Sequence, residues 1–157
     1  MKKLMKLLPL LILPIILMTS CTLKITKDTD DPCKYIDKLK NNLDTYKISS
    51  VELLEVKFNR NFLINDYQSE MLNNSIDYLC IDNLKELDEN FNETPTYKLF
   101  ITFESNEKFV IEIYKDGLVS VFPWDGKGNK EFFTSDNIPE GYKFFNYCEF
   151  INPKTYK

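Results

Sequence analysis

The sequence of 157 residues contains no histidine, no alanine and a single arginine, Arg60. Without histidine there is no imidazole base, no Ser-His or Cys-His nucleophile pair and no histidine-ligated metal site. Most familiar hydrolytic and redox machinery is therefore excluded. A Ser-Lys nucleophile and a pair of carboxylates remain open, but no pattern singles out such residues. We expect a protein that is not an enzyme and that holds no cofactor.

Long hydrophobic runs are also missing, apart from one at the start of the chain. A basic segment, Met1–Lys6, precedes an apolar run from Leu7 to Met18. A helix that crosses a bilayer needs about 20 apolar residues. This run is shorter and contains Pro9 and Pro14. It is typical of a secretory signal peptide, which we place over residues 1–20.

The residues that end this run resemble the lipobox of bacterial lipoproteins. They are Met18-Thr19-Ser20-Cys21, and the pattern prefers leucine where this chain has Met18. The resemblance implies that Cys21 receives a diacylglyceryl thioether and becomes the first residue of the mature chain. The lipid would anchor the protein to the outer face of the cytoplasmic membrane, on the extracellular side. An ordinary cleaved signal and an uncleaved N-terminal anchor are the alternatives.

Charge argues against nucleic acid as a partner. The whole chain has 20 basic and 24 acidic residues, and removal of Lys2, Lys3 and Lys6 with the signal leaves a net charge of −7. A clearly acidic domain binds nucleic acid poorly.

Residues 21–32 form a polar stretch that we interpret as a tether. Its aspartates lack the glycine turn and distal glutamate of a calcium loop, so we expect no metal.

Three cysteines remain beyond the lipobox: Cys33, Cys80 and Cys148. In an exported domain they allow at most one disulfide, and the pairs 33–80, 33–148 and 80–148 all stay open. The other interpretation is that they are buried thiols that pack as small apolar groups. Their wide spacing argues against a metal site.

Helical periodicity occurs in three places. The segment 34–43 has apolar residues at helical spacing, and a short last helix is expected over 142–151. The clearest helix is 65–80, where Asn65 and Gln68 match a capping box. The residues expected to face the core are Ile36, Leu39 and Leu43 in the first helix; Tyr67, Met71, Leu72, Ile76 and Leu79 in the second; and Phe144, Tyr147, Cys148 and Ile151 in the last.

Alternating patterns predict strands over 48–58, 97–104, 109–114 and 118–122, with a brief edge strand over 130–133. Asp116-Gly117 is a strong hairpin signal. We therefore predict one α+β domain over residues 33–157. It contains an antiparallel β-meander of three to five strands covered by a helix, with short N- and C-terminal helices. On the second face of the sheet, Phe100, Val110 and Tyr114 predict an apolar patch that would suit a partner.

The most specific feature is the run Phe122-Pro123-Trp124-Asp125-Gly126. Trp124 is the only tryptophan, and it stands where a strand gives way to a glycine-containing loop. Such loops carry binding residues more often than strands do, and an exposed indole can stack on a sugar, a peptide or an aromatic partner. The alternative is a tryptophan that folds back over the edge of the sheet.

Several stretches together resemble a family of small clostridial lipoproteins of unknown function. The resemblance is carried by Tyr97–Phe103, Phe109–Tyr114, Val121–Gly126, Asn137–Pro139 and Tyr147-Cys148. It covers roughly the last 60 residues together with the lipobox, and the Pro-Trp-Asp-Gly run is its most distinctive part. The resemblance implies no activity, but it supports a surface lipoprotein and a role for the corner at 121–126.

Two functions follow from these patterns. The first is a lipid-anchored surface module that binds a peptide, a glycan or a protein at the cell envelope without catalysis. The second is an immunity or inhibitor lipoprotein that sequesters a cationic toxin or an enzyme, to which its acidic charge would be suited.

Overall fold

The computed structural model describes residues 31–87, 91–125 and 130–153, and Pro32–Lys157 form one compact unit. The expected signal peptide, the lipidation site Cys21, most of the tether and Gly126 lie outside the described residues.

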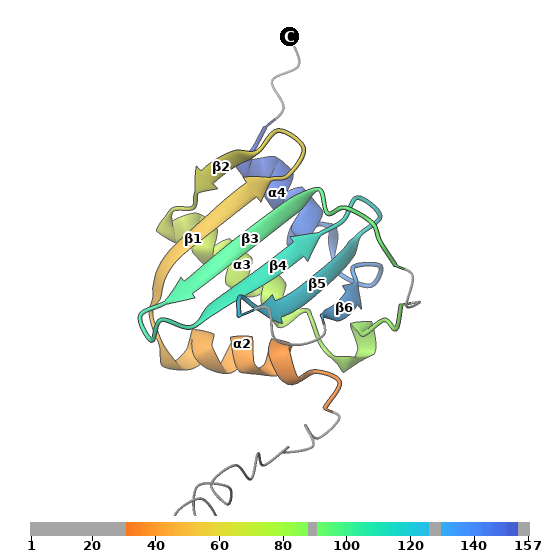
Figure 1. Ribbon diagram of the computed structural model, residues 1–157, viewed down its shortest axis with the longest axis horizontal. Helices are drawn as coiled ribbons and strands as arrows, with labels where there is room; N and C mark the ends of the chain where they lie inside the picture. Colours follow the sequence, from red (N-terminus) through yellow and green to blue (C-terminus); the bar gives the residue numbers. More distant parts are fainter. Residues whose placement is uncertain (1–30, 88–90, 126–129, 154–157) are drawn as a thin grey trace, which may run out of the picture. The chain divides into compact units, whose positions relative to one another are not determined.

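The centre of the unit is a six-stranded antiparallel sheet with the order β2-β1-β3-β4-β5-β6 (Figure 1). Its strands are β1 (Ile48–Glu55), β2 (Arg60–Leu63), β3 (Tyr97–Phe103), β4 (Lys108–Ile113), β5 (Leu118–Pro123) and β6 (Glu131–Thr134). The last four strands form a continuous meander, as the sequence predicts. The sheet has one strand more than the three to five expected.

Helices cover one face of the sheet. The described helices are α2 (Lys34–Thr45), α3 (Asp66–Asp77) and α4 (Phe144–Ile151), with the 3-10 turns η1 (Ile81–Asn83) and η2 (Glu140–Tyr142). Figure 1 shows α3 and α4 behind the sheet and α2 across one end of the strands. None of the described helices lies in front of the sheet, so we call that side the outer face. None of the described helices is long and apolar enough to cross a membrane.

Strand alternation decides what the covered face contains. Six side chains of the central hairpin are buried in the core as predicted: Leu99, Ile101, Phe103, Phe109, Ile111 and Ile113. Burial of each of these large apolar side chains stabilises the fold by about 1.5–3 kcal/mol. The same alternation sends Lys98, Phe100 and Glu112 to the outer face.

Helix α3 confirms the predicted capping box but corrects one residue that was expected to face the core. Its capping box is present, because Asn65 Oδ1 accepts the Gln68 N–H at 2.9 Å and Gln68 Oε1 accepts the Asn65 N–H at 3.0 Å. Leu72 is fully buried as expected, but Tyr67 is 67% exposed, which corrects its place in the stripe. Tyr67 stands five residues before Leu72. Around the axis of an α-helix, positions five residues apart differ by about 140°, so Tyr67 points away from the core when Leu72 points into it.

The first strand is shorter than predicted. It ends at Glu55, and the chain turns through Asn59 at a φ of 49° into β2, which the sequence analysis missed. Phe58, expected in the strand, lies in this turn and is 58% exposed. Glu55, the last residue of the strand, points into the protein, where its carboxylate accepts hydrogen bonds from Arg60 and from Asn152 Nδ2. The buried carboxylate therefore ties the β1–β2 hairpin to the end of α4.

The two central turns follow their sequence signals. Asn106 has a φ of 66° between β3 and β4, and Gly117 has a φ of 85° between β4 and β5. A left-handed backbone suits glycine and asparagine best, so Asp116-Gly117 forms the expected hairpin. The brief strand expected over 130–133 is β6, which is an edge strand of the sheet.

Candidate functional site

The predicted corner begins at the end of β5. Phe122 and Pro123 are half-buried, and the Trp124 N–H donates to the Lys108 carbonyl at 3.0 Å, which continues the pairing with β4. Trp124 is 57% exposed. Asp125 is exposed as well, while Gly126 lies outside the described residues. The corner therefore displays a large aromatic group on a backbone held by the sheet.

Trp124 rests on the outer face rather than standing free in solvent. Its ring meets Phe100 edge-to-face, with centroids 4.9 Å apart. Such a pair adds about 0.5–1.5 kcal/mol beyond the area that it buries. The tryptophan does fold back over the sheet, as the alternative interpretation holds, and yet more than half of its surface stays accessible. Packing fixes the orientation of the ring and leaves it open to a ligand.

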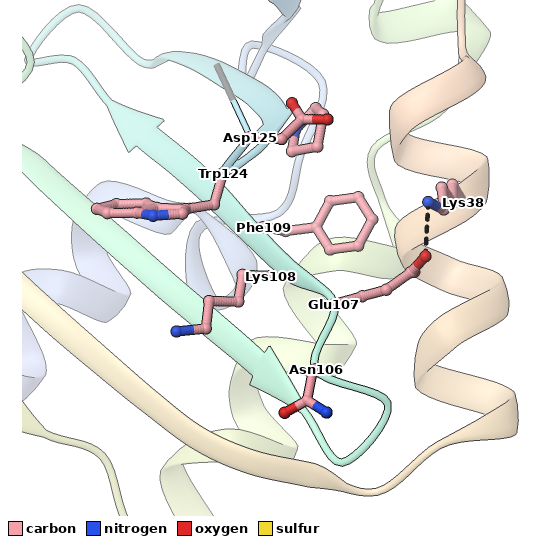
Figure 2. A pocket seen from close by; sticks show the side chains of 8 residues that line it. Lys38, Asn106, Glu107, Lys108, Phe109, Trp124 and Asp125 are labelled. Carbon is pink, nitrogen blue, oxygen red and sulfur yellow. Dashed lines mark ion pairs between the residues drawn. The ribbon is translucent and has the colours of Figure 1, made fainter. Parts of the chain in front are cut away.

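A pocket of about 250 Å³ lies at this corner (Figure 2). Three segments supply its wall: α2, the β3–β4 hairpin and the end of β5. The lining residues are Lys38, Asn106, Glu107, Lys108, Phe109, Pro123, Trp124 and Asp125. In Figure 2, Trp124 and Lys108 point to one side of the sheet, while Phe109, Glu107 and Lys38 lie on the other. The pocket thus joins the helix-covered side of the sheet to the outer face.

Glu107 is the electrostatic centre of the pocket. Lys38 Nζ lies 2.8 Å from its carboxylate, and Asn42 Nδ2 also donates to that carboxylate. The hydrogen bonds from Asn42 and Lys38 hold the pKa of Glu107 below its usual value. The group is therefore ionised at neutral pH and is paired with Lys38 and Asn42 on α2.

The same hairpin contains the spacing Ser-x-x-Lys, at Ser105 and Lys108, which corrects the expectation that no pattern singles out a Ser-Lys pair. Here Ser105 Oγ accepts the Glu107 N–H at 3.4 Å, as is common in turns. The residues lie in a turn and at the start of a strand, and no described contact joins the hydroxyl to the lysine.

A second polar cluster occupies the outer face next to the corner. The carboxylate of Glu112 on β4, whose side chain is 3% exposed, is bound by Lys98 on the neighbouring strand β3 and by Lys130, which directly precedes β6. Lys98 Nζ lies 2.8 Å from Oε1, and Lys130 Nζ lies 2.5 Å from Oε2. Two hydroxyl groups also donate to Oε2, from Tyr114 at 2.9 Å and from Ser120 at 3.2 Å.

These contacts set the ionisation of the cluster. Burial raises the pKa of Glu112, but the hydrogen bonds from Lys130, Lys98 and Tyr114 outweigh it, and the pKa of Glu112 lies below its usual value. Burial and the nearby charge of Glu112 raise the pKa of the Tyr114 hydroxyl above its usual range. Glu112 is thus a carboxylate beneath two ammonium groups, and Tyr114 stays a neutral donor.

The apolar patch expected on the outer face needs correction. Phe100 is half-buried, but Val110 and Tyr114 are each only 2% exposed. Phe91, which comes before β3, packs edge-to-face on Tyr114 with centroids 5.4 Å apart. The aromatic surface that remains accessible is therefore shifted along the sheet, toward the Trp124 corner.

The cysteines lie away from this corner. Cys33 is buried at the start of α2, Cys148 is buried in α4 and Cys80 is exposed before η1. Cys80 and Cys148 carry free thiols, so none of the pairs 33–80, 33–148 and 80–148 is bonded. Among the residues that the structure describes, no three Cys, Asp or Glu side chains gather where they could hold a metal ion.

The sequence pattern indicates the tryptophan but not the residues that surround it. Lys98, Lys130, Glu107 and Lys38 reach the corner or the outer face from separate segments. One sequence pattern does point to them: Lys98 and Glu112 lie at outward positions of their predicted strands, on the same face as Phe100. A pair of opposite charges on adjacent strands of a predicted hairpin would have indicated the ion pair.

Comparisons with known proteins agree with this architecture. The solved structure described as "Crystal Structure of Putative Lipoprotein from Clostridium perfringens" is similar, with a TM-score of 0.70 and 24% sequence identity. The similarity covers 78% of this chain and 97% of that one, and at this identity it shows a shared fold. A search of curated proteins returned no match. The expected resemblance to a clostridial lipoprotein family of unknown function is confirmed. Residues 29–148 match the family described as "Domain of unknown function (DUF4883)", and the chain belongs to this family.

Proposed function

We propose that this protein is a lipid-anchored, non-enzymatic binding module of the cell envelope, and that it binds its ligand at the Trp124 corner. The ligand is a peptide, a glycan or a protein outside the cytoplasmic membrane. The observation that carries the proposal is the state of Trp124, which is 57% exposed while its ring is held against Phe100.

The structure supports this use of the corner in two ways. The aromatic ring is positioned in advance, so binding costs little side-chain entropy. The adjacent pocket offers ionic and polar groups from Lys38, Glu107 and Lys108 beside the apolar ring of Phe109. A few polar groups around an apolar surface are typical of small recognition sites.

The anchor is proposed from the sequence. The lipobox-like run ending at Cys21 supports lipidation, and the structural similarity to the clostridial protein is in keeping with it. Acyl chains at the first residue of the mature chain would hold the domain at the membrane with the tether between them.

The second function, capture of a cationic toxin or enzyme, gains no support at this corner. Lys98, Lys108 and Lys130 stand around the accessible aromatic surface, so this surface is less suited to a cationic partner than the acidic charge of the whole chain suggests. That function stays a prediction from the overall acidic charge.

Cosedimentation with purified bacterial envelope tests the proposal. The purified domain, residues 22–157, contains the whole described sheet and core. We expect it to pellet with envelope material, and we expect Trp124→Ala to reduce the bound fraction about tenfold, as for an aromatic residue that dominates a binding site.

The matched control is Phe150→Ala, because Phe150 on α4 is 56% exposed and lies away from the outer face. We expect this variant to bind like the parent. Equal binding by Trp124→Ala and the parent would refute a role for the corner. The anchor is tested separately, by comparing palmitate incorporation in cells that express the full chain or its Cys21→Ser variant.

A further inference from the structure

The outer face carries cations whose positions are fixed. Lys98 and Lys130 are bound to opposite oxygens of one buried carboxylate, at 2.8 Å and 2.5 Å. Their side chains are 31% and 39% exposed, whereas that of Glu112 is 3% exposed. A ligand approaching this face therefore meets two ammonium groups, and the compensating negative charge lies beneath them. Each ammonium has three donors, so both can bind a ligand without leaving Glu112.

Aromatic rings lie between and beside these cations. Strand register places Phe100 opposite Val110, and Val110 opposite Phe122, in one row across β3, β4 and β5. Trp124 packs on Phe100, and Lys130 Nζ lies 5.0 Å from the centroid of the Phe122 ring. Lys108, which is exposed, points to the same side of the sheet as Trp124 (Figure 2). Lysines and aromatic rings thus alternate over this end of the outer face.

The cationic surface of the outer face ends at β1. Glu52 on β1 is paired with Phe100 in the sheet and is exposed. Its negative charge ends the cationic surface at β1. The favourable region for an anion therefore runs across β3, β4, β5 and the start of β6.

We propose that this face binds an anionic carbohydrate chain, with sugar rings on Trp124 and Phe122 and carboxylate, sulfate or phosphate groups at Lys98, Lys130 and Lys108. The proposal rests on the proposed function, because it names the ligand of the same corner. The exposed face of an aromatic ring suits the apolar C–H face of a sugar, while ammonium groups supply charge-assisted hydrogen bonds to the anionic substituents.

Two other occupants fit the observations less well. An acidic peptide would need pockets for several of its side chains. The pocket described at this corner, with a volume of about 250 Å³, is too small to take them. An anionic bilayer is a broad surface, and it would repel the mature domain with its net charge of −7. A thin carbohydrate chain meets only the lysine-bearing face.

The test uses the purified domain, residues 22–157, and the emission of its only tryptophan. Dextran sulfate and polygalacturonate are the anionic probes, and uncharged dextran is the matched neutral glycan. We expect both anionic probes to protect Trp124 from acrylamide, with an affinity that falls as salt rises. We expect dextran to bind about tenfold or more weakly, because it cannot pair with the lysines.

Variants locate the binding. The pair Lys98→Gln with Lys130→Gln should weaken binding about tenfold or more. Because this pair leaves Glu112 without its ion partners, Lys108→Gln is a second variant that disturbs no described contact, and it should weaken binding about threefold. The control pair, Lys47→Gln with Lys57→Gln, removes two exposed cations near the ends of β1, and it should bind like the parent.

Several results would overturn the proposal. Equal binding of dextran and dextran sulfate would exclude charge recognition, and equal loss in the control pair would show diffuse attraction. Stronger protection of Trp124 by poly-L-glutamate, or by phosphatidylglycerol vesicles, would point to an acidic protein or a membrane. If uncharged dextran binds equally well, or if poly-L-glutamate protects more strongly, the corner still binds a glycan or a protein and the proposed function stands; diffuse attraction or a preference for vesicles would overturn both proposals. If no probe protects Trp124, the carbohydrate proposal fails, and the envelope cosedimentation of Trp124→Ala decides the function independently.

Discussion

The carboxylate of Glu131 on β6 accepts a hydrogen bond of 2.9 Å from the backbone N–H of Ile36, 95 residues earlier in the chain. Its other oxygen receives the N–H of Tyr35 at 2.6 Å. Cys33 at the N-cap supplies no side-chain capping bond, so a distant strand satisfies the first turn of α2. An anion at a helix N-terminus is also favoured by the helix dipole. The helix that directly follows the proposed tether is thereby fixed to the edge of the sheet.

Replacement of Glu131 by glutamine should therefore destabilise the domain. Glutamine keeps one acceptor but places an NH₂ group against a backbone donor, and the negative charge is lost. We expect the free energy of unfolding to fall by about 1–3 kcal/mol, measured by urea denaturation at neutral pH. The control is Glu104→Gln, at an exposed turn, which should change stability by less than about 0.5 kcal/mol. Equal effects of the two changes would contradict this role of Glu131.

Glu112 should give the domain a stability that depends on pH. The pKa of this carboxyl is lowered in the folded state from its ordinary value of 4.5, by hydrogen bonds that outweigh burial. A lowered pKa stabilises the fold at pH values above the unfolded pKa, and this contribution is lost as pH falls through the folded value. Between pH 7 and pH 3 we expect the urea midpoint of the parent to fall, and that of Glu112→Gln to fall less.

The comparison must separate Glu112 from the other carboxylates. Glu107 also has a lowered pKa, so some acid sensitivity should remain in Glu112→Gln. The double variant with Glu107→Gln should be flatter still. A single variant with the same pH profile as the parent would show that the pairing of Glu112 with Lys98 and Lys130 does not stabilise the fold.

The environment of Trp124 can be measured directly, because it is the only tryptophan in the chain. Because this residue is 57% exposed, it should emit at a long wavelength and be quenched readily by acrylamide in the folded domain. Phe100→Leu should raise the quenching constant further, because it removes the ring that holds the indole against the sheet. A blue-shifted emission that resists quenching would contradict the exposed corner.

The thiols of the domain should differ in reactivity. Cys80 is exposed, whereas Cys148 is fully buried, and burial raises the pKa of its thiol well above the usual value. Since the thiolate is the reactive form, Ellman's reagent should modify Cys80 fast in the native domain and Cys148 only after unfolding. Cys80→Ser should abolish the fast phase. A fast phase that persists in this variant would place a reactive thiol elsewhere.

Local patterns in the sequence predicted the elements that depend on near neighbours. The Asn65–Gln68 capping box, the alternation of β3 and β4 and the turn at Gly117 all involve residues within a few positions of one another. Their physical causes, namely side-chain hydrogen bonds to the adjacent backbone and the rotation of successive side chains, act in the isolated segment. The structure confirms each of them.

Strand β2 escaped prediction because its stability comes from its partner. Its four residues carry no apolar alternation, and three of them are exposed. It forms because β1 offers a paired edge after the turn at Asn59. Glu55 points inward because it shares the buried face of β1 with Val51 and Leu53. The partners that satisfy its carboxylate there, Arg60 and Asn152, lie outside the local pattern of β1.

By itself, the sequence determined the α+β class, the central meander and an unusual tryptophan at the end of a strand, since these follow from composition and short-range periodicity. Only the tertiary structure decided what surrounds that tryptophan. It brought Phe100 under the indole, joined Lys98 and Lys130 through Glu112 and set Lys38 beside Glu107. These contacts connect strands and helices that are distant in the chain, and they exist only because sheet pairing and core burial fix the positions of their backbones.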